Sequence, residues 1–284
     1  SGGAQAQQSL LDHGLHVDQV MGRVCLALEE LGARAPGAHG ARLFNAIANA
    51  LQGFEALPLL RRRRNALQLS AEDCTQALIR MIAACLTVVF EAADSACDPD
   101  IAKLLVALFH FMQGKELAGQ ERALGAIGFT QGFFDDVTRQ RLVDRIDGQQ
   151  ACFEIFLSHS SADVQTTFSL HCQPDRETEQ LRRVACTRQP AADDGLTALA
   201  WFALQTARLE HLRTLEETLI ADLMTAVDER IYRNDEYVPP ADEQDDPLIQ
   251  YPEKPLLTLV RQQAREIEQL SRQLASLRDT LEER

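Results

Sequence analysis

Residues 99–128, PDIAKLLVALFHFMQGKELAGQERALGAIG, carry apolar side chains at the spacing of one helix face. The apolar stripe is formed by Ile101, Leu104, Leu105, Leu108 and Met112. Spacings of three and four residues place side chains on one side of an α-helix, and Asp98 before Pro99 is a typical helix start. The segment therefore predicts a long amphipathic helix that packs against other helices.

The same periodicity dominates the rest of the chain, and no segment alternates apolar and polar residues as a strand would. Ser70 with Asp73, and Asp175 after Pro174, indicate further helix starts. We expect helices at about residues 4–33, 39–68, 71–93, 99–128, 135–158, 162–172, 175–188 and 194–233. Long amphipathic helices with short connections form antiparallel bundles, so the predicted fold class is all-α.

The composition is that of an acidic globular protein. The chain has 284 residues, of which 45% are hydrophobic, and a formal net charge of -14. Such a charge repels nucleic acid and anionic membranes on average, so any bound anion must be held by local arginines. We find no apolar run near the length of a bilayer span and no opening signal peptide, and therefore expect a cytoplasmic protein without a membrane partner.

The seven cysteines, at positions 25, 74, 85, 97, 152, 172 and 186, form no CxxC pair and lie mostly in apolar helical stretches. This pattern indicates buried thiols in a reducing compartment. Cys152, His159, His171 and Cys172 could approach one another if two helices fold back, which would suit an enzyme with a metal site. Their spacing matches no metal-binding motif, and HExxH, P-loop, GxSxG and ExxH motifs are absent, so we expect neither catalysis nor a metal or other cofactor.

The most basic stretch is Arg61–Arg64, in LPLLRRRRNALQLS, and it raises the question of nucleic-acid binding. Successive helical residues turn by about 100°, so the four side chains point in four directions and form no single phosphate-binding face. We prefer to interpret the run as a solvated, partly ion-paired helix surface.

Arg122 has an unusual setting because small residues surround it, namely Ala118, Gly119, Ala123, Gly125 and Ala126. Small side chains let neighbouring helices approach, so this guanidinium should be partly desolvated. A desolvated arginine needs a partner, and a small planar anion matches its paired N–H donors. An ion pair with Glu116, Glu121 or a more distant carboxylate is the alternative, and the residues alone favour that ion pair.

The sequence changes character after residue 234. Residues 235–255 contain five of the ten prolines and seven acidic residues against one lysine, which is typical of an extended linker. Beyond it, a heptad pattern is formed by Val260, Ile267, Leu270, Leu274, Leu277 and Leu281. We therefore expect a helical domain over 1–234, a linker over 235–255, and a coiled-coil helix over 256–284 that forms a homodimer.

Several segments resemble the nitrate- and nitrite-sensing (NIT) domain family. They are KELAGQERALGAIGFTQGFF at 115–134, FEAAD at 90–94, LVALFHFMQGKE at 105–116, LRRVA at 181–185 and WFALQTARLEHL at 201–212. The resemblance covers nearly all of residues 1–233 and implies two antiparallel four-helix bundles linked by long helices. It also implies a sensor without catalysis, whose arginines grip nitrate or nitrite.

By this resemblance, Arg122 matches the arginine of an internal ERA/ERG motif, and LRRVA supplies a further ligand arginine, Arg182 in preference to Arg183. The family also carries an ERG-type arginine on a first helix, which we expect to precede Ser1 and to be missing from this chain.

The tail LSRQLASLRDTLEER, at 270–284, resembles the first helix of ANTAR domains, which are RNA-binding modules of transcription antiterminators. We therefore expect such a module beyond Arg284, with a leader RNA of nitrate-assimilation genes as its partner. The alternative from another class is a structural helical adaptor that dimerises by its coiled coil and keeps its arginines ion-paired.

Overall fold

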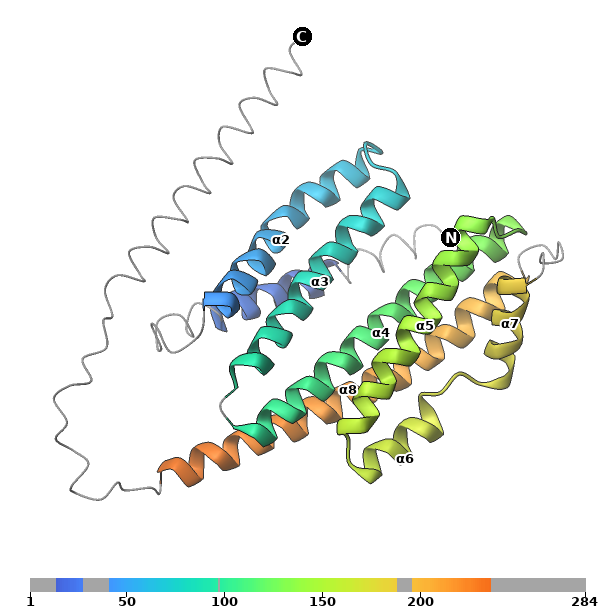
Figure 1. The fold of residues 1–284 in the computed structure, drawn as a ribbon. Helices are drawn as coiled ribbons and strands as arrows, with labels where there is room; N and C mark the ends of the chain where they lie inside the picture. Colours follow the sequence, from blue (N-terminus) through green and yellow to red (C-terminus); the bar gives the residue numbers. More distant parts are fainter. Residues whose placement is uncertain (1–13, 28–40, 97, 188–195, 236–284) are drawn as a thin grey trace, which may run out of the picture. The chain divides into compact units, whose positions relative to one another are not determined.

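The structure, a computed structural model, describes residues 14–27, 41–96, 98–187 and 196–235. These residues are helical apart from the turns that join the helices, which confirms the predicted all-α fold (Figure 1). Described residues up to Cys74 belong to one compact unit, and those from Thr75 onward belong to another. Apart from Asp235, the predicted linker and coiled coil lie outside the described residues.

The helix bounds agree with the expected ones to within a few residues wherever the chain is described. Residues 14–27 are helical, and the remaining helices are α2 (Ala41–Asn65), α3 (Ala71–Ser95), α4 (Pro99–Gln131), α5 (Asp136–His159), α6 (Ala162–His171), α7 (Arg176–Thr187) and α8 (Leu196–Asp235).

The three predicted helix starts each have a side-chain cap, as do α5 and α6. The hydroxyl of Ser70 accepts a hydrogen bond from the Asp73 N–H at 3.0 Å, and the Asp175 carboxylate accepts one from the Thr178 N–H at 2.7 Å. Asp98 accepts bonds at 2.9 and 3.1 Å from two N–H groups in the first turn of α4. Each cap satisfies N–H groups that have no partner within the helix, so polar residues at these points fix where the helices start.

The first unit contains the arginine run at the end of α2. Arg61 donates to both carboxylate oxygens of Asp18, at 2.6 and 2.8 Å, and both side chains are partly exposed. Arg64 donates to the side-chain oxygen of its neighbour Asn65. The predicted ion pairing of this helix surface is thus confirmed for Arg61.

Helix α3 corrects one expectation from the sequence. Its segment Glu72–Ser95 is long and apolar enough to cross a bilayer by length and composition, although the sequence was expected to contain no such run. Most of this segment is not buried, and one of its side chains, Phe90, packs on Phe109 of α4 with ring centroids 5.3 Å apart. A single helix of this kind is weak evidence for a membrane span, because helices of soluble proteins pass the same test.

In the second unit, α4 packs along both α5 and α8, and the three long helices run side by side (Figure 1). The short helix α6 packs on α8, and α7 contacts α4, α5 and α8. Ion pairs add to the contact between α4 and α8, including Lys115 with Glu216, and Arg230 with Asp98 at 3.3 Å.

Two hydrophobic clusters form the core of this unit. One is built around Phe111, Phe153, Phe156, Phe168 and Leu212, and the other around Phe129, Phe134, Leu142 and Trp201. Along α4, α5 and α8 the residues of one cluster precede those of the other, and buried polar residues lie between them. The second unit is therefore a bundle whose two apolar ends enclose a polar middle.

Candidate anion-binding site

The polar middle of the bundle, called the polar layer below, consists of Glu121, Gln149, Thr178, Arg182, Gln205 and Arg208, all of them buried. Helix α4 supplies the carboxylate, α5 one amide, α7 the threonine and one arginine, and α8 the other amide and arginine. Buried polar groups are costly unless hydrogen-bonded, so the contacts inside this layer determine its chemistry.

Glu121 is fully buried because α4 carries small residues around it. Ala118 is also fully buried, and a Cβ at Gly125 would lie only 2.2 Å from Cε2 of Trp201. The tryptophan of α8 thus lies directly against the α4 backbone, and its indole N–H donates to the Arg122 carbonyl at 3.0 Å. Small residues on α4 therefore let α8 approach closely enough to enclose the carboxylate.

Arg182 holds this carboxylate with two parallel hydrogen bonds. Its Nε donates to Oε1 of Glu121 at 2.7 Å, and its Nη2 donates to Oε2 at 2.7 Å. Its Nη1 donates to Glu179, whose side chain is 43% exposed, at 2.8 Å. Paired donation of this kind is the strongest contact between a guanidinium and a planar anion.

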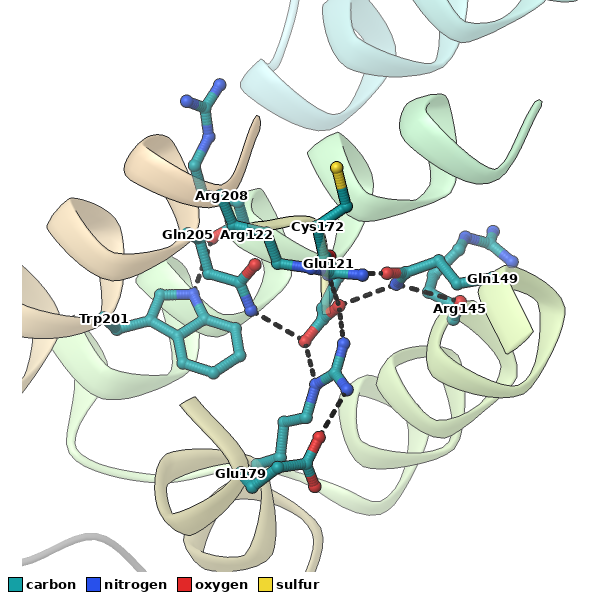
Figure 2. A network of polar contacts seen from close by, with 10 residues as sticks. Glu121, Arg122, Arg145, Gln149, Cys172, Glu179, Trp201, Gln205 and Arg208 are labelled. Carbon is teal, nitrogen blue, oxygen red and sulfur yellow. Dashed lines mark hydrogen bonds and ion pairs between the residues drawn. The ribbon is translucent and has the colours of Figure 1, made fainter. Parts of the chain in front are cut away.

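Two amides complete the surroundings of Glu121. Gln149 donates to its Oε2 at 2.6 Å, and Gln205 donates to its Oε1 at 2.9 Å. Figure 2 shows Glu121 at the centre of these contacts. Because each of its oxygens accepts two bonds, the carboxylate is well satisfied as a charged group.

Arg208 has a different environment. Its Nε donates to the Cys172 carbonyl at 2.9 Å, and its Nη1 donates to the side-chain oxygen of Gln149 at 3.0 Å. The nearer oxygen of Glu121 is 3.9 Å from Nη1, beyond hydrogen-bond distance. The hydrogen bonds of this guanidinium are therefore to neutral oxygens, and its ion pair with Glu121 is longer than that of Arg182, although the two arginines are similarly buried.

The two arginines consequently differ in pKa. Burial alone would lower the pKa of Arg182, but hydrogen bonds and the charge of Glu121, followed by Glu179, raise it above the ordinary value. For Arg208, burial and then the charge of Arg182 lower the pKa to about 10. Arg208 remains charged at neutral pH, but its charge is incompletely compensated.

A cavity of about 300 Å³ adjoins the polar layer, and Arg182 and Arg208 are among the residues that line it. Its lining is half polar and half apolar: Gln149, Gln150, Glu154, Gln173, Glu179, Arg182 and Arg208, together with Ile146, Phe153, Leu157, Phe168 and Pro174. All of these residues belong to the second unit. The lining residues Gln150, Glu154 and Gln173 are exposed, so the cavity is open to solvent, and a small anion in it would lie close to Arg182 and Arg208.

The three arginines predicted to bind ligand have different positions. Arg182 lies in the polar layer, whereas Arg183 is exposed on α7. Arg122 is partly buried on another side of α4, where its Nη1 donates to Thr206 at 3.0 Å and its guanidinium lies 4.8 Å from the ring centre of Phe202. Within the described residues its contacts are these, not an ion pair with the adjacent Glu121, which is bound to Arg182.

Neither the burial of Glu121 nor a role for Arg208 was predicted from the sequence. A signal was present in WFALQTARLEHL, because Trp201, Gln205, Arg208 and Leu212 follow the spacing of one helix face. An arginine at a core position of that face is unusual, and it requires either a carboxylate or an anion as its partner.

The cysteines and histidines considered as a metal site do not form one within the described residues. Cys152 is buried with its thiol 3.6 Å from the Gln113 side-chain oxygen, and His159 bonds to its own helix. Burial raises the pKa of the Cys172 thiol to about 11, which leaves it protonated at neutral pH. The six cysteines that the structure describes are free thiols, and two of them are buried.

The fold is an all-helical bundle with a buried polar layer of two arginines and one carboxylate, and comparison with known families shows to which family it belongs. The nitrate and nitrite sensing family matches residues 1–224, so the chain belongs to this family.

Two relatives are similar over most of the chain. The nitrate regulatory protein of Klebsiella oxytoca is 50% identical over 270 residues, which is 94% of this chain and 67% of that protein. The solved structure of the NasR transcription antiterminator is 48% identical, with a TM-score of 0.70, over 94% of this chain and 68% of that one.

Proposed function

We propose that this chain senses nitrate or nitrite by binding the anion at arginines next to the polar layer, without catalysing a reaction. Membership of the nitrate and nitrite sensing family supports the choice of ligand. The observation that carries the proposal is the pair formed by Arg182 and Glu121, with two parallel bonds of 2.7 Å. The pair is an example, within this core, of a planar anion held by a guanidinium, and nitrate is another planar oxyanion that an arginine can bind in this way.

Arg182 can contact an anion while it keeps its present partners. A guanidinium has five N–H donors, and three of those of Arg182 are used by Glu121 and Glu179. The remaining donors belong to the two Nη atoms of a residue in the cavity wall. We therefore assign the cavity as the ligand site and Arg182 as one of its ligands.

Arg122 and Arg183 are also proposed to contribute to ligand binding, but to different extents. Arg122 is partly buried, stacks on an aromatic ring and donates to a hydroxyl, so its charge is only partly satisfied. Arg183 is exposed, and water can hydrate its charge. We propose that Arg122 supports binding from its side of α4, and that Arg183 contributes least of the three.

We also propose an output through α8 and the residues that follow it. The helix carries Gln205 and Arg208 in the polar layer and continues to Asp235, where the predicted linker begins. One relative is a transcription antiterminator, so we propose that anion binding controls an RNA-binding module acting on the leader RNA of nitrate-assimilation genes. The heptad pattern of residues 256–284 supports a homodimer. We further propose a cytoplasmic location without a membrane partner, because the relatives are transcription regulators.

Thermal unfolding in nitrate and in chloride at equal ionic strength tests this function. A ligand that binds only the folded state stabilises it by about 2.7 kcal/mol at a concentration a hundred times its Kd. We expect nitrate and nitrite, but not chloride, to raise the Tm of the chain. A structural adaptor with ion-paired arginines would show the same Tm in all three salts, and that result would reject the sensor.

A further inference from the structure

We propose that Arg230 of α8 forms an ionic latch with Asp98 and Asp100 at the start of α4, and that this latch holds the end of α8 in place. One apolar cluster, which includes Phe111 and Leu212, lies between the latch and the polar layer. The inference goes beyond the proposed function, because the contacts that carry it involve no anion.

Apolar burial is weak where α8 leaves α4. Among the described side chains of α8, the last buried one is that of Leu215, although the helix continues to Asp235. The first buried side chain of α4 is that of Ala107. From there to Arg230, the side chains of α8 are exposed or half-buried, and that of Met224 is 54% exposed. A segment with few buried apolar contacts opens easily, so the end of α8 depends on its polar contacts.

Arg230 meets both carboxylates with one edge of its guanidinium. Its Nε lies 3.3 Å from Oδ2 of Asp98, and its Nη2 donates to Oδ2 of Asp100. The other carboxylate oxygen of Asp98 accepts hydrogen bonds from the N–H groups of Asp100 and Ile101, at 2.9 and 3.1 Å. The residue that caps the start of α4 therefore also contacts the end of α8.

The latch is a small charge network rather than a single surface pair. An isolated exposed ion pair contributes little to stability, whereas several charges that share one geometry contribute more. The side chain of Arg230 is 39% exposed and that of Asp100 is 76% exposed, so dissolved ions can screen their attraction. The latch should therefore weaken as the salt concentration rises, unlike the buried pair of Glu121 and Arg182.

The latch attaches α8 to α4 at a point beyond the polar layer. In the polar layer, Gln205 of α8 donates to Glu121 of α4, and Arg230 lies towards the other end of α8. Any movement that separates the end of α8 from α4 has to break the contacts of Arg230. The latch therefore sets how easily the end of α8 is released, which is the step that an output through this helix would use.

Hydrogen exchange of the whole chain, measured by mass spectrometry without nitrate, tests the latch. Arg230→Gln removes the positive charge, and we expect the amides of residues 221–235 to exchange about two- to fivefold faster at low salt. Asp100→Asn should act in the same direction but less strongly, because Asp98 keeps its contact. The amides of residues 201–215, in the buried part of α8, should exchange as in wild type in both variants.

Arg213→Gln is the matched control. Arg213 is also an arginine of α8, and its guanidinium donates to Glu210 and Glu217 of the same helix. Its loss removes ion pairs within α8 and leaves the contact between α8 and α4 intact. We expect residues 221–235 of this variant to exchange as they do in wild type.

Salt dependence gives a second, independent readout. Sodium chloride at about 1 M screens charges beyond about 3 Å. It should accelerate exchange of residues 221–235 relative to residues 201–215 in wild type, and have little further effect in Arg230→Gln. Equal salt effects in the two proteins would show that other groups hold the end of α8.

Two further results would overturn the latch: unchanged exchange of residues 221–235 in Arg230→Gln at low salt, or equal acceleration in Arg213→Gln. Either result leaves the sensor function intact, because the measurements contain no nitrate. Conversely, a wild type whose Tm does not respond to nitrate or nitrite would reject the sensor, while faster exchange in Arg230→Gln alone would still support the latch.

Discussion

Glu121 on α4 and Arg182 on α7 are 61 residues apart in sequence and meet in the core through two parallel hydrogen bonds of 2.7 Å. The carboxylate is fully buried and the arginine nearly so. Their contact joins α4 to α7 in the polar layer, which lies between the two apolar clusters of the bundle. It also shows that the core of this unit is built to hold a planar anion against a guanidinium.

Removing this carboxylate should be costly. Glu121→Ala would leave Arg182 buried with only the half-exposed Glu179 as its partner, and breaking a buried pair in this way costs about 3–5 kcal/mol. Urea unfolding, followed by fluorescence of the single tryptophan, Trp201, measures the loss. Glu210→Ala breaks an exposed pair and should cost less than about 1 kcal/mol. Equal losses in the two variants would contradict this description of the core.

Two glycines of α4 should respond in opposite ways to the same substitution. A Cβ at Gly125 would lie 2.2 Å from the Trp201 ring, so Gly125→Ala should destabilise the fold by about 1–3 kcal/mol through overpacking. A Cβ at Gly119 meets nothing within 4 Å, so Gly119→Ala should gain up to about 1 kcal/mol from helix propensity. Urea unfolding of both variants checks the pair, and a stabilised Gly125→Ala would show that Trp201 does not pack as described.

Stability should fall on mild acidification because of His110. Burial, and then the nearby charge of His159, lowers the pKa of His110, and its buried Nδ1 has no hydrogen-bond partner among the described residues. Because the folded state binds the His110 proton more weakly than the unfolded state does, protonation favours unfolding. The stability present above pH about 6.5 is therefore lost as pH falls from that value through the lower pKa of the folded state.

The Tm of wild type should therefore decrease between pH 7.5 and 5.5, and His110→Phe should flatten that decrease. An identical decrease in the variant would assign it to other groups.

The proposed dimer can be tested through the predicted coiled coil. Leu270 and Leu277 occupy the same position of two successive heptads, and aspartate at both would place charges in the apolar seam. We expect sedimentation to show a dimer for wild type and a monomer for Leu270→Asp/Leu277→Asp. A dimer that persists in the double variant would place the interface elsewhere.

Much of the fold could be predicted because its determinants are local. The stripe from Ile101 to Met112 and the caps at Ser70, Asp98 and Asp175 each act within a turn or two of the chain, and the structure has helices where they indicate. The apolar run of α3 was not predicted, because charged residues near its ends and one within it divide the segment into shorter apolar stretches. Its mean hydropathy is nevertheless high.

The polar layer could be predicted only in part, because its contacts join distant segments. Glu121 was considered as a partner for the adjacent Arg122, but neighbouring side chains on a helix point about 100° apart. The carboxylate therefore faces Arg182, and Arg122 faces Phe202 and Thr206. The partners of Arg208, Gln149 and the Cys172 carbonyl, lie far from it in the sequence, so only the folded structure brings them together.

The central claim, that this chain binds nitrate at buried arginines, is tested most directly by calorimetric titration of Arg182→Lys and Arg183→Lys. The two positions are adjacent, but one guanidinium lies in the cavity wall and the other is exposed. A charge-assisted hydrogen bond contributes about 1.5–3 kcal/mol, so Arg182→Lys should weaken nitrate binding by roughly ten- to a hundredfold. Arg183→Lys should bind as wild type does. Unchanged nitrate affinity in Arg182→Lys, or a loss confined to Arg183→Lys, would contradict the assignment of the site.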